Sequence, residues 1–434
     1  MTGTSDNTTT PPPKAPDVVI ANGRPKSGPG ANSDDTNSSK PLKVLVVGAG
    51  IGGLSAAASL RQAGHHSRIA NEIGAAIHVG VNASQALDFL GYDPARLQGV
   101  DCETMTMYAP DGSKLRDVRH DWVKKTYKSP WVLTHRADLH NELKFLALDP
   151  SRPGKVPVLH LSSRVSMVDP ATGMLELENG QQHIGDIIVG ADGIYSTTRD
   201  QVVGSMPLYS VGEACYRFTI PVGKIAADPE CLSLLSNGSM TGMALIIEPA
   251  RRMIIYPCRN GQLLNFVCMH PDTHDNVSQN WNSMATKEDV LNEYKDWAPE
   301  ITKVISHAED DVRCWRLLQR PDPPKFNEGR FCLVGDAAHP MLPHQGQGGG
   351  QAIEDGVALG VLFEGAVASD DVPVLLDLYN QVRYQRATTV ERLSREAAVG
   401  KSKLRPDAVQ RYVFGHSVVE YAKHAKSSVF LAPK

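Results

Sequence analysis

The residues with the clearest chemical potential are three glycines spaced as Gly48-x-Gly50-x-x-Gly53. They follow the apolar run Val44–Val47, typical of a strand buried on both faces of a parallel sheet, and precede an Ala-rich helical segment, Leu54–Gln62. Gly48 permits a tight turn, Gly50 lets the backbone approach a pyrophosphate, and Gly53 lets helix and strand pack closely. The helix N-terminus adds free N–H groups and a positive dipole. The spacing therefore predicts a dinucleotide site, with a ligand-free glycine turn as the alternative.

Two later segments narrow the predicted dinucleotide to FAD. The first, 190–199, carries Asp192; the second, 335–355, carries Asp336 and the glycine-rich run 345–350. A carboxylate at the end of a strand can accept hydrogen bonds from ribityl hydroxyls, and a glycine-rich loop that enters a helix can hold the electron-rich edge of a reduced flavin ring. Either segment alone could be a strand-end aspartate beside a flexible loop, but all three segments together favour FAD.

With these segments, the chain resembles the single-component FAD-dependent monooxygenases of the aromatic-hydroxylase type, and within them the fungal salicylate-hydroxylase-like branch of secondary metabolism. The resemblance covers about residues 43–400, and 335–355 is its most specific part. Further matching segments are Glu72–Ile77, Asn82-Ala83, His135–Leu139, Tyr216–Phe218 and Tyr256–Gly261.

The resemblance implies a role in FAD binding for each matching residue. Gly48, Gly50 and Gly53 hold the pyrophosphate, Gly74 and Ala76 line the flavin, Arg136 contacts FAD, Asp192 serves both FAD and NAD(P)H, Asp336 binds the ribityl chain, and Gly349 lies beside the isoalloxazine. From the residues alone, Arg136 could instead cap the helix that follows it or pair with Asp138.

Arg217 and Tyr256 match the positions that orient and polarise the phenol in related hydroxylases. The resemblance implies that NAD(P)H reduces FAD and that O2 supplies the oxygen atom transferred to an electron-rich aromatic or enolic carbon. Arg217 would stabilise a phenolate, because deprotonation enriches the ring carbon that attacks, and Tyr256 would hydrogen-bond the same oxygen. The alternatives are an ordinary salt bridge for Arg217 and core packing for Tyr256.

The sequence departs from the family pattern after the first helix. The fingerprint calls for an acidic residue about 20 residues after the glycines, at the end of a second strand, to bind a ribose hydroxyl. Here only the six residues His66–Asn71 separate Gly64-His65 from Glu72, with no apolar β-branched run among them. Two hypotheses follow. Either a compressed strand at 67–71 brings Glu72 near the ribose, or the second strand is damaged and FAD affinity falls.

The order of expected elements predicts an α/β fold of two domains: a Rossmann-like FAD-binding domain interrupted by a β-sheet substrate domain and followed by C-terminal helices. We expect a disordered tail at 1–40, the FAD-binding domain at 41–205, the substrate-binding domain at 206–325, the second FAD-binding part with helices at 326–400, and a C-terminal segment at 401–434. Expected elements are strands at Val165–Val168, Met174–Leu177, Ile184–Val189 and Phe331–Val334, a hairpin of Met253–Pro257 and Leu263–Cys268, and a helix at Val374–Val399.

Composition excludes several other classes. The chain has 434 residues, 41% hydrophobic and 21% charged, with a net charge of −4 and no basic block, which argues against nucleic-acid binding. Its seven cysteines form no Cys-x-x-Cys pair. We therefore expect a reducing compartment, and neither a disulfide framework nor a metal site. The mildly apolar stretch 352–368 carries three acidic residues and the N-terminus lacks an apolar core, so we expect a cytoplasmic protein without a membrane span or secretory signal.

The sequence thus predicts an FAD-dependent, NAD(P)H-consuming monooxygenase that hydroxylates a phenolic, aromatic or polyketide-derived small molecule, in secondary-metabolite biosynthesis. One alternative within the class is an epoxidase of a prenylated substrate. Others are a catalytically impaired homologue with a shortened second strand, and a non-catalytic relative that acts in interaction or redox sensing. The pocket residues between about 206 and 320 decide the substrate, and the sequence does not identify it.

Overall fold

A six-stranded sheet positions the glycine-rich turn. The computed structural model describes residues 40–69, 77–231, 240–272, 282–365, 367–398 and 405–430. The strand order is β19–β20–β12–β1–β2–β8, and every neighbouring pair except β19–β20 is parallel. The bounds are β1 (Lys43–Val47), β2 (His66–Ile69), β8 (Val158–Leu159), β12 (Ile187–Gly190), β19 (Asn327–Glu328) and β20 (Phe331–Leu333). The carboxyl ends of β1, β12 and β20 therefore meet at one edge, where α/β sheets bind ligands.

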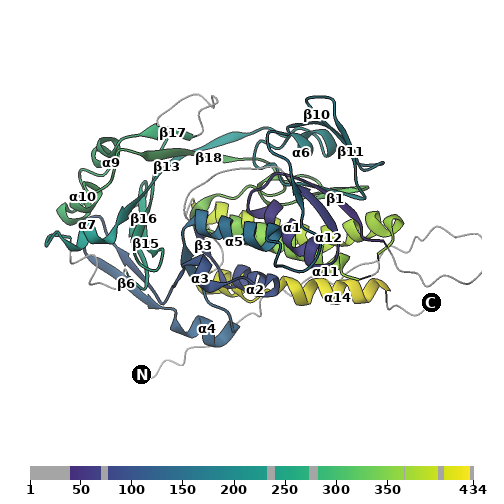
Figure 1. Ribbon diagram of the computed structural model, residues 1–434. Helices are drawn as coiled ribbons and strands as arrows, with labels where there is room; N and C mark the ends of the chain where they lie inside the picture. The colour runs from purple at the N-terminus through teal and green to yellow at the C-terminus, as the bar shows by residue number, and fades with distance from the viewer. Residues whose placement is uncertain are drawn as a thin grey trace, which may run out of the picture.

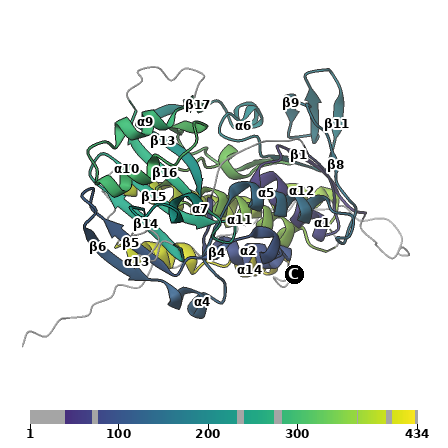
Figure 2. The same cartoon turned by 60° about the vertical axis from the view of Figure 1, so that its left-hand side comes forward.

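Helices bury the apolar strands of this sheet. Helix α1 packs between α5 and α11, and α11 is covered in turn by α2, α12 and α14, an arrangement visible in Figures 1 and 2. Helices α1 and α11 cross closely because Gly356 faces the α1 backbone: a Cβ on Gly356 would lie 2.5 Å from the Ala56 nitrogen. The bounds are α1 (Ile51–Gln62), α2 (Val81–Leu90), α5 (Arg136–Leu148), α11 (Gly348–Phe363), α12 (Val372–Ala398) and α14 (Val418–Phe430).

An eight-stranded sheet forms the other half of the molecule, on the left of Figure 1. Its order is β17–β18–β13–β16–β15–β14–β5–β6. The strands are β5 (Thr104–Tyr108), β6 (Lys114–Arg119), β13 (Tyr209–Pro221), β14 (Gly242–Ile247), β15 (Arg252–Cys258), β16 (Leu263–Pro271), β17 (Asn282–Ala285) and β18 (Val312–Gln319). This sheet thus includes β5 and β6, which precede residue 206, the expected start of the substrate-binding domain.

The two faces of the large sheet have different partners. Phe218 and Ile220 pack on the outer face against α9 (Lys287–Glu293) and α10 (Pro299–Ile305). Cys215 points the other way and packs with Leu342, which belongs to the segment leading into α11, and with Leu393 of α12. Because side chains alternate along a strand, odd-numbered residues of β13 face the half of the molecule that contains the six-stranded sheet.

The remaining elements are short. Strands β3 (Ile77–Val79), β7 (Val132–Thr134) and β4 (Val100–Asp101) form one small sheet, and β9 (Val165–Asp169), β10 (Met174–Leu177) and β11 (Gln182–Ile184) form another. The helices are α3 (Pro94–Leu97), α4 (Asp121–Tyr127), α6 (Thr197–Val202), α7 (Val222–Ala226) and α13 (Pro406–Phe414), with 3-10 turns η2 (Gly335–Ala337), η3 (Pro343–Gln345) and η4 (Ser369–Asp371).

Most of the expected elements are confirmed within one to three residues, but one expected strand is wrong. The segment Ile184–Val189 is split between β11 and β12, because Gly185 packs against Leu45, where a Cβ would lie 2.8 Å from that side chain, and the Asp186 carboxylate accepts the Lys43 N–H at 2.8 Å. Residues 1–39 of the expected tail lie outside the described residues.

The second strand exists despite its short sequence. β2 pairs in parallel with β1, with His66 opposite Lys43 and Arg68 opposite Leu45, and it also pairs with β8. The compressed strand is thus present at His66–Ile69, whereas Glu72 lies outside the described residues.

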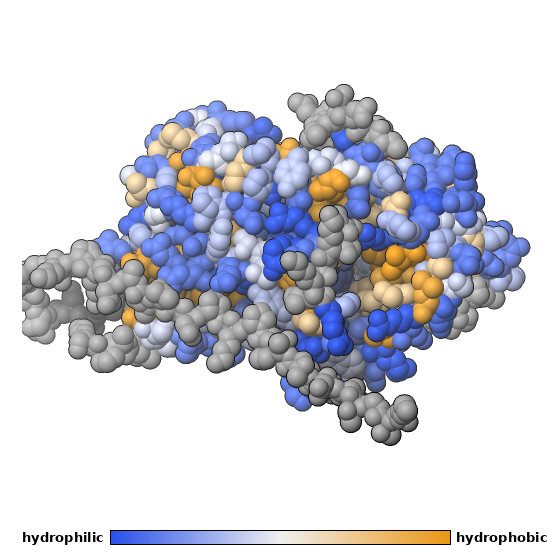
Figure 3. Space-filling view, turned by 180° about the vertical axis from the view of Figure 1, so that it is seen from behind, coloured by the Kyte–Doolittle hydropathy of each residue, from blue (hydrophilic) through white to orange (hydrophobic). Residues whose placement is uncertain are grey.

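The outer surface on the face opposite to Figure 1 is mainly hydrophilic, and its apolar residues gather in separate patches (Figure 3). None of the helices in the described part of the chain combines the length and hydropathy that a membrane span requires.

Candidate active site

The turn after β1 can be made only with glycine. Gly48 has φ +109°, and a Cβ there would lie 2.2 Å from the Ala191 carbonyl oxygen; a Cβ on Gly53 would lie 2.0 Å from the Gly48 oxygen. Gly50 is the N-cap of α1, no described side chain caps this end, and the first turn holds no acidic residue. The N–H groups of the first helical turn therefore remain available to an anion, as a pyrophosphate site requires.

Asp336 lies at the edge of the sheet, in η2 directly after β20. Its side chain is open to solvent, yet protein surrounds it closely enough that desolvation raises the pKa of its carboxyl, while the positive charges of His339 and Arg136 lower it. A carboxyl that is open to solvent and yet desolvated by its neighbours lies on the wall of a recess, and Asp336 has both properties. Arg136, the first residue of α5, is close enough to act on this carboxylate, so two of the predicted FAD-binding residues lie near each other.

The entry to α11 is a second uncapped helix N-terminus. No described side chain caps it, and its first residues are Gly348, Gly349 and Gly350. A Cβ on Gly349 would lie 2.3 Å from Cδ1 of Ile77, and one on Gly346, at φ +57°, would lie 1.6 Å from Nε2 of His78. This loop therefore packs its backbone directly on β3, which leaves no room for side chains.

His78 holds the glycine-rich loop as a neutral ring. Burial lowers its pKa to about 4, and a hydrogen bond to the backbone of Gln345 acts in the opposite direction. The Trp131 indole N–H donates to Nδ1 of His78 at 3.1 Å. Nε2 of His78 is thus the nitrogen that carries the proton and faces the loop.

Asp192 organises the turn after β12. Its carboxylate accepts hydrogen bonds from the Ser196 hydroxyl at 2.5 Å, the Thr198 N–H at 3.0 Å and the Thr198 hydroxyl at 2.7 Å. These bonds fix the start of α6 and place the backbone of Asp192 against Gly48. The geometry thus gives the Asp192 side chain a structural task beside the pyrophosphate turn.

Asp355 ties the turn at Gly335, next to Asp336, to the helices α11 and α12. Its carboxylate accepts from the Gly335 N–H at 2.8 Å, from Nε2 of His339 at 2.7 Å and from Nε of Arg383 at 2.7 Å, all of them buried. Burial alone would raise the pKa of Asp355, but the charges of His339 and Arg383 and these hydrogen bonds more than offset it, and the pKa is lowered. The ionised carboxylate fixes the backbone next to Asp336.

Glu354 continues the same buried network. It accepts from Nη1 of Arg383 at 2.5 Å, from Nη2 of Arg386 at 3.1 Å and from the Asn82 amide at 2.6 Å. The network joins α2, α11 and α12 behind the loop. The arginines of α12 were not predicted as supporting residues. The available signal was the adjacent carboxylate pair Glu354-Asp355 in an otherwise apolar helix, because buried carboxylates require cationic partners.

Arg217 and Tyr256 lie on the same, inward face of the large sheet. In the β13–β16 pairing Arg217 is opposite Val267, and in the β15–β16 pairing Tyr256 is opposite Asn265, two residues along the same face. Nε of Arg217 is buried and has no hydrogen-bond partner among the described residues, although the guanidinium also lies beside the Cys215 thiol. Such an orphaned donor is rare in a folded protein and is often completed by a ligand or by water.

Tyr256 is 4% exposed, and burial raises the pKa of its phenol well above the ordinary value; the charge of Arg217 acts in the opposite direction. Tyr256 therefore keeps its proton at neutral pH and can donate a hydrogen bond. Around it the face is lined by methionines and aliphatic residues, namely Met105, Met243, Leu245, Ile254 and Val267. Apolar walls with a few polar groups are the usual composition of a small-molecule site.

Gly74 and Ala76 lie outside the described residues, as does Glu72. Their predicted contacts with FAD therefore remain predictions.

Comparisons with known proteins agree with this geometry. Two models described as FAD binding domain match residues 43–154 and 171–394. FAD-dependent monooxygenase cfoG of Aspergillus candidus is 35% identical over 378 residues, which cover 83% of this chain and 86% of that protein. This chain belongs to the FAD-dependent monooxygenases.

A second relative and a solved structure extend the comparison of this monooxygenase. Hispidin-3-hydroxylase of Neonothopanus nambi is 35% identical over 367 residues, covering 80% of this chain and 86% of that protein. A salicylate hydroxylase solved with its substrate has the same fold, with a TM-score of 0.73 at 22% identity over 89% of this chain and 98% of the other. The monooxygenase is thus a two-domain α/β enzyme with FAD as its cofactor.

Proposed function

We propose that this enzyme consumes NAD(P)H and hydroxylates a phenolic, aromatic or polyketide-derived small molecule in secondary metabolism. The observation that carries the proposal is the placement of Arg217 and Tyr256 on one apolar sheet face, opposite the segment that leads into the glycine-rich end of α11. Hispidin-3-hydroxylase, a relative with 35% identity, is by its name a hydroxylase of hispidin. Hydroxylation of a substrate of that kind also fits the polar pair Arg217 and Tyr256.

The residues present fit FAD. The uncapped N-termini of α1 and α11 offer N–H groups to anionic and electron-rich parts of the cofactor, and the turns at Gly48 and Gly349 leave no space for a Cβ. Asp336 and Arg136 add a carboxylate and a cation on the wall of the recess. We assign the pyrophosphate to Gly48, Gly50 and Gly53, and the ribityl chain to Asp336. FAD, once reduced, supplies the activation of O2.

The protein orients and polarises the substrate. Arg217 holds the phenolate oxygen, since a guanidinium beside an apolar wall favours the ionised form of a phenol. Tyr256 is protonated at neutral pH, as an ordinary tyrosine is, and burial raises the pKa of its phenol further, so it donates a hydrogen bond to the same oxygen. The methionine and aliphatic side chains around them exclude water and pack on the ring, with Met243 and Val267 nearly buried. Together these groups present an electron-rich carbon to the oxygen donor.

A substrate panel tests the proposal. The purified FAD-loaded enzyme is incubated with NADPH or NADH and a series of phenols, and both nucleotide consumption and product mass are followed. We expect at least one phenol to accelerate nucleotide oxidation and to yield a product heavier by one oxygen atom. Fully loaded flavoprotein that oxidises neither nucleotide faster with any phenol, and forms no oxygenated product, would overturn the proposal while leaving FAD binding intact.

A further inference from the structure

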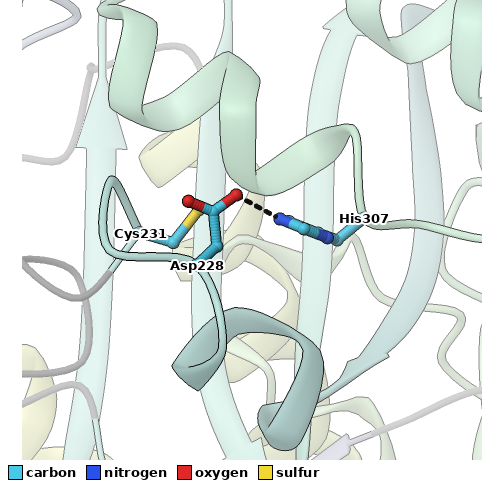
Figure 4. A group of neighbouring side chains, drawn as sticks. All are labelled: Asp228, Cys231 and His307. Atoms are coloured by element: carbon cyan, nitrogen blue, oxygen red, sulfur yellow. Dashed lines mark hydrogen bonds and ion pairs between the residues drawn. The ribbon is translucent and has the colours of Figure 1, made fainter.

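We propose that Asp228, Cys231 and His307 form a binding site for a divalent transition-metal ion, with Zn²⁺ the ion that their chemistry fits best (Figure 4). The three side chains supply a carboxylate, a thiol and an imidazole, which together are typical zinc ligands. The site has no part in the flavin chemistry described above, because it lies where the outer-face elements α7 and α10 end.

The ligand atoms already converge. One ligand atom from each side chain lies within 4.8 Å of the other two, and Oδ2 of Asp228 is 3.0 Å from Nε2 of His307. In Figure 4 the sulfur lies directly beside the carboxylate, and the ring nitrogen points toward it. Ligand atoms around a tetrahedral Zn²⁺ lie roughly 3.3–3.8 Å apart, given Zn–S and Zn–N distances of about 2.3 and 2.1 Å. Small side-chain rotations are sufficient to reach that spacing.

The backbone holds two of the ligands in register. After α7 the chain reads Asp228-Pro229-Glu230-Cys231, and the Cys231 N–H donates to the Asp228 carbonyl at 3.0 Å. The Glu230 N–H donates to Oδ1 of Asp228 at 3.1 Å, which leaves Oδ2 directed at His307. Two ligands separated by two residues are a frequent spacing in zinc sites. A search for Cys-x-x-Cys pairs does not detect a mixed pair of this kind, so the sequence predicted no metal site.

Solvent can reach the site from one side. The side chains of Asp228 and His307 are 17% and 25% exposed, whereas Cys231 is fully buried beneath them. An ion can therefore enter past the carboxylate and imidazole and meet the sulfur at the bottom. Three protein ligands leave a fourth position, which a water molecule or the nearby Glu230 carboxylate can fill.

In the absence of an ion, the ammonium of Lys303 supplies the positive charge beside the carboxylates. Its Nζ lies 3.5 Å from Oδ2 of Asp228 and 3.6 Å from Oε2 of Glu230, so one ammonium balances both carboxylates. The Lys303 side chain is 41% exposed and can swing into water when a dication arrives. Lys303 is thus a competitor for the metal, and its removal should strengthen metal binding.

Cobalt titration tests the site. The full-length, FAD-loaded enzyme is stripped with a chelator and titrated with Co²⁺, which replaces Zn²⁺ and reports thiolate ligation through a near-ultraviolet charge-transfer band. We expect a single Co²⁺ per chain with this band, which Zn²⁺ then displaces. C231S should abolish the band, and H307Q should weaken binding by more than about 100-fold, since changes even to second-shell partners reduce affinity about 10- to 100-fold. K303Q should tighten binding several-fold.

Two matched controls separate this site from adventitious binding. C314S removes the partly exposed thiol of β18, and H424Q removes an exposed histidine of α14; neither should change the titration. Co²⁺ that produces no thiolate band, or a band that persists in C231S or is lost only in C314S, would overturn the proposal. Should C231S fail to fold, as judged by its FAD content, H307Q and K303Q decide, because the site requires them to shift affinity in opposite directions.

Discussion

Arg217 is the residue on which the proposed substrate chemistry depends most. It is held in the middle of a long strand, with an orphaned buried Nε and with its charge acting on Tyr256. A guanidinium placed before substrate arrives needs no reorganisation during the reaction, and this is how preorganised donors stabilise developing charge.

R217A should leave FAD bound and reduce product formation. Removal of one preorganised donor at a developing oxyanion lowers kcat by about 10²- to 10³-fold, so we expect a loss in that range with unchanged flavin content. The control is R313A: Arg313 lies directly opposite Arg217 on β18 but is exposed. Steady-state turnover and the flavin absorbance measure the two effects. Unchanged turnover in R217A would remove Arg217 from the catalytic residues.

Glu391 should make the stability of the enzyme depend on pH. It is 1% exposed on α12, accepts a hydrogen bond from the Gln319 amide at 2.8 Å and pairs with Arg395 at 2.5 Å. Burial outweighs both of these partners and raises its pKa to about 7. Because the folded-state pKa is raised, its stabilising contribution is complete below the unfolded pKa, about 4.3, and is lost as the pH rises through 7.

E391Q should therefore match the wild type near pH 4 and exceed its free energy of unfolding above pH 8 by up to about 4 kcal/mol, at 1.36 kcal/mol per pKa unit. Chemical denaturation at several pH values measures the difference. The control is E396Q, on the same helix, where Glu396 forms a partly exposed pair with Arg392. Its free energy of unfolding should change with pH in the same way as that of the wild type. Parallel curves for E391Q as well would show that Glu391 is ionised in the folded enzyme across this range.

At the scale of elements, the crossing of α1 and α11 brings the N-termini of these two helices close together, near the turn at Gly335. Gly356 and Gly360 lie one turn apart on α11 and allow its backbone to touch α1 at Ala56 and Ser59. The separation of the helices sets the position of the turn at Gly50 relative to the loop before Gly348. A change in this contact should therefore affect stability and FAD affinity together.

G356A should destabilise the enzyme. Its Cβ would meet the α1 backbone at 2.5 Å, and overpacking of this kind costs typically about 1–3 kcal/mol. FAD affinity, measured by quenching of flavin fluorescence, should weaken in parallel. G223A, in the short helix α7 with nothing within 4 Å of its Cβ, should be nearly neutral. Equal behaviour of the two variants in chemical denaturation would contradict a close helix crossing.

The elements that the sequence predicted well are those whose local patterns agree with their tertiary setting. The apolar run of β1, the hairpin of β15 and β16, and the helix α12 all lie where periodicity and turn residues place them. The prediction of one strand around Gly185 is wrong because a tertiary contact interrupts it: the Asp186 carboxylate accepts the N–H of Lys43, 143 residues away in sequence. Hydrogen bonds over such separations leave no local pattern.

At the site, motif residues were predictable and their supports were not. The sequence motifs predicted that Gly48 and Asp336 follow buried strands, and the structure places them directly after β1 and β20; their contacts with FAD stay predictions. The partners of Asp355, by contrast, come from Gly335, His339 and Arg383, and only the folded chain brings Arg383 to them. Arg217 and Tyr256 were predicted by resemblance, while their common face became evident only from the register of β13, β15 and β16.

At the scale of the whole molecule, the proposed FAD site draws on segments spread over most of the chain. The turn at Gly48, Arg136 on α5, Asp192 after β12 and Asp336 after β20 meet at one edge of the sheet. In the proposed site no single segment holds the cofactor, so we expect FAD to bind the folded state only. Such selective binding couples cofactor affinity to global stability.

FAD at 100 times its Kd should raise the free energy of unfolding by about 2.7 kcal/mol. Thermal denaturation with increasing FAD measures the shift, which should grow with the logarithm of the FAD concentration. D336A should need more FAD for the same shift, since it lacks the carboxylate assigned to the ribityl chain. A melting temperature that does not respond to FAD would mean that the cofactor does not select the folded state.

We propose that this monooxygenase transfers one atom of O2 to a phenolic substrate held by Arg217 and Tyr256. The most direct measurement is a single reaction of the FAD-loaded enzyme with NADPH and its preferred phenol under oxygen-18 gas, followed by mass spectrometry of the product. We expect one heavy oxygen atom in the product of the wild type and little product from R217A. Nucleotide consumption that yields only hydrogen peroxide, or a product whose new oxygen comes from water, would contradict it.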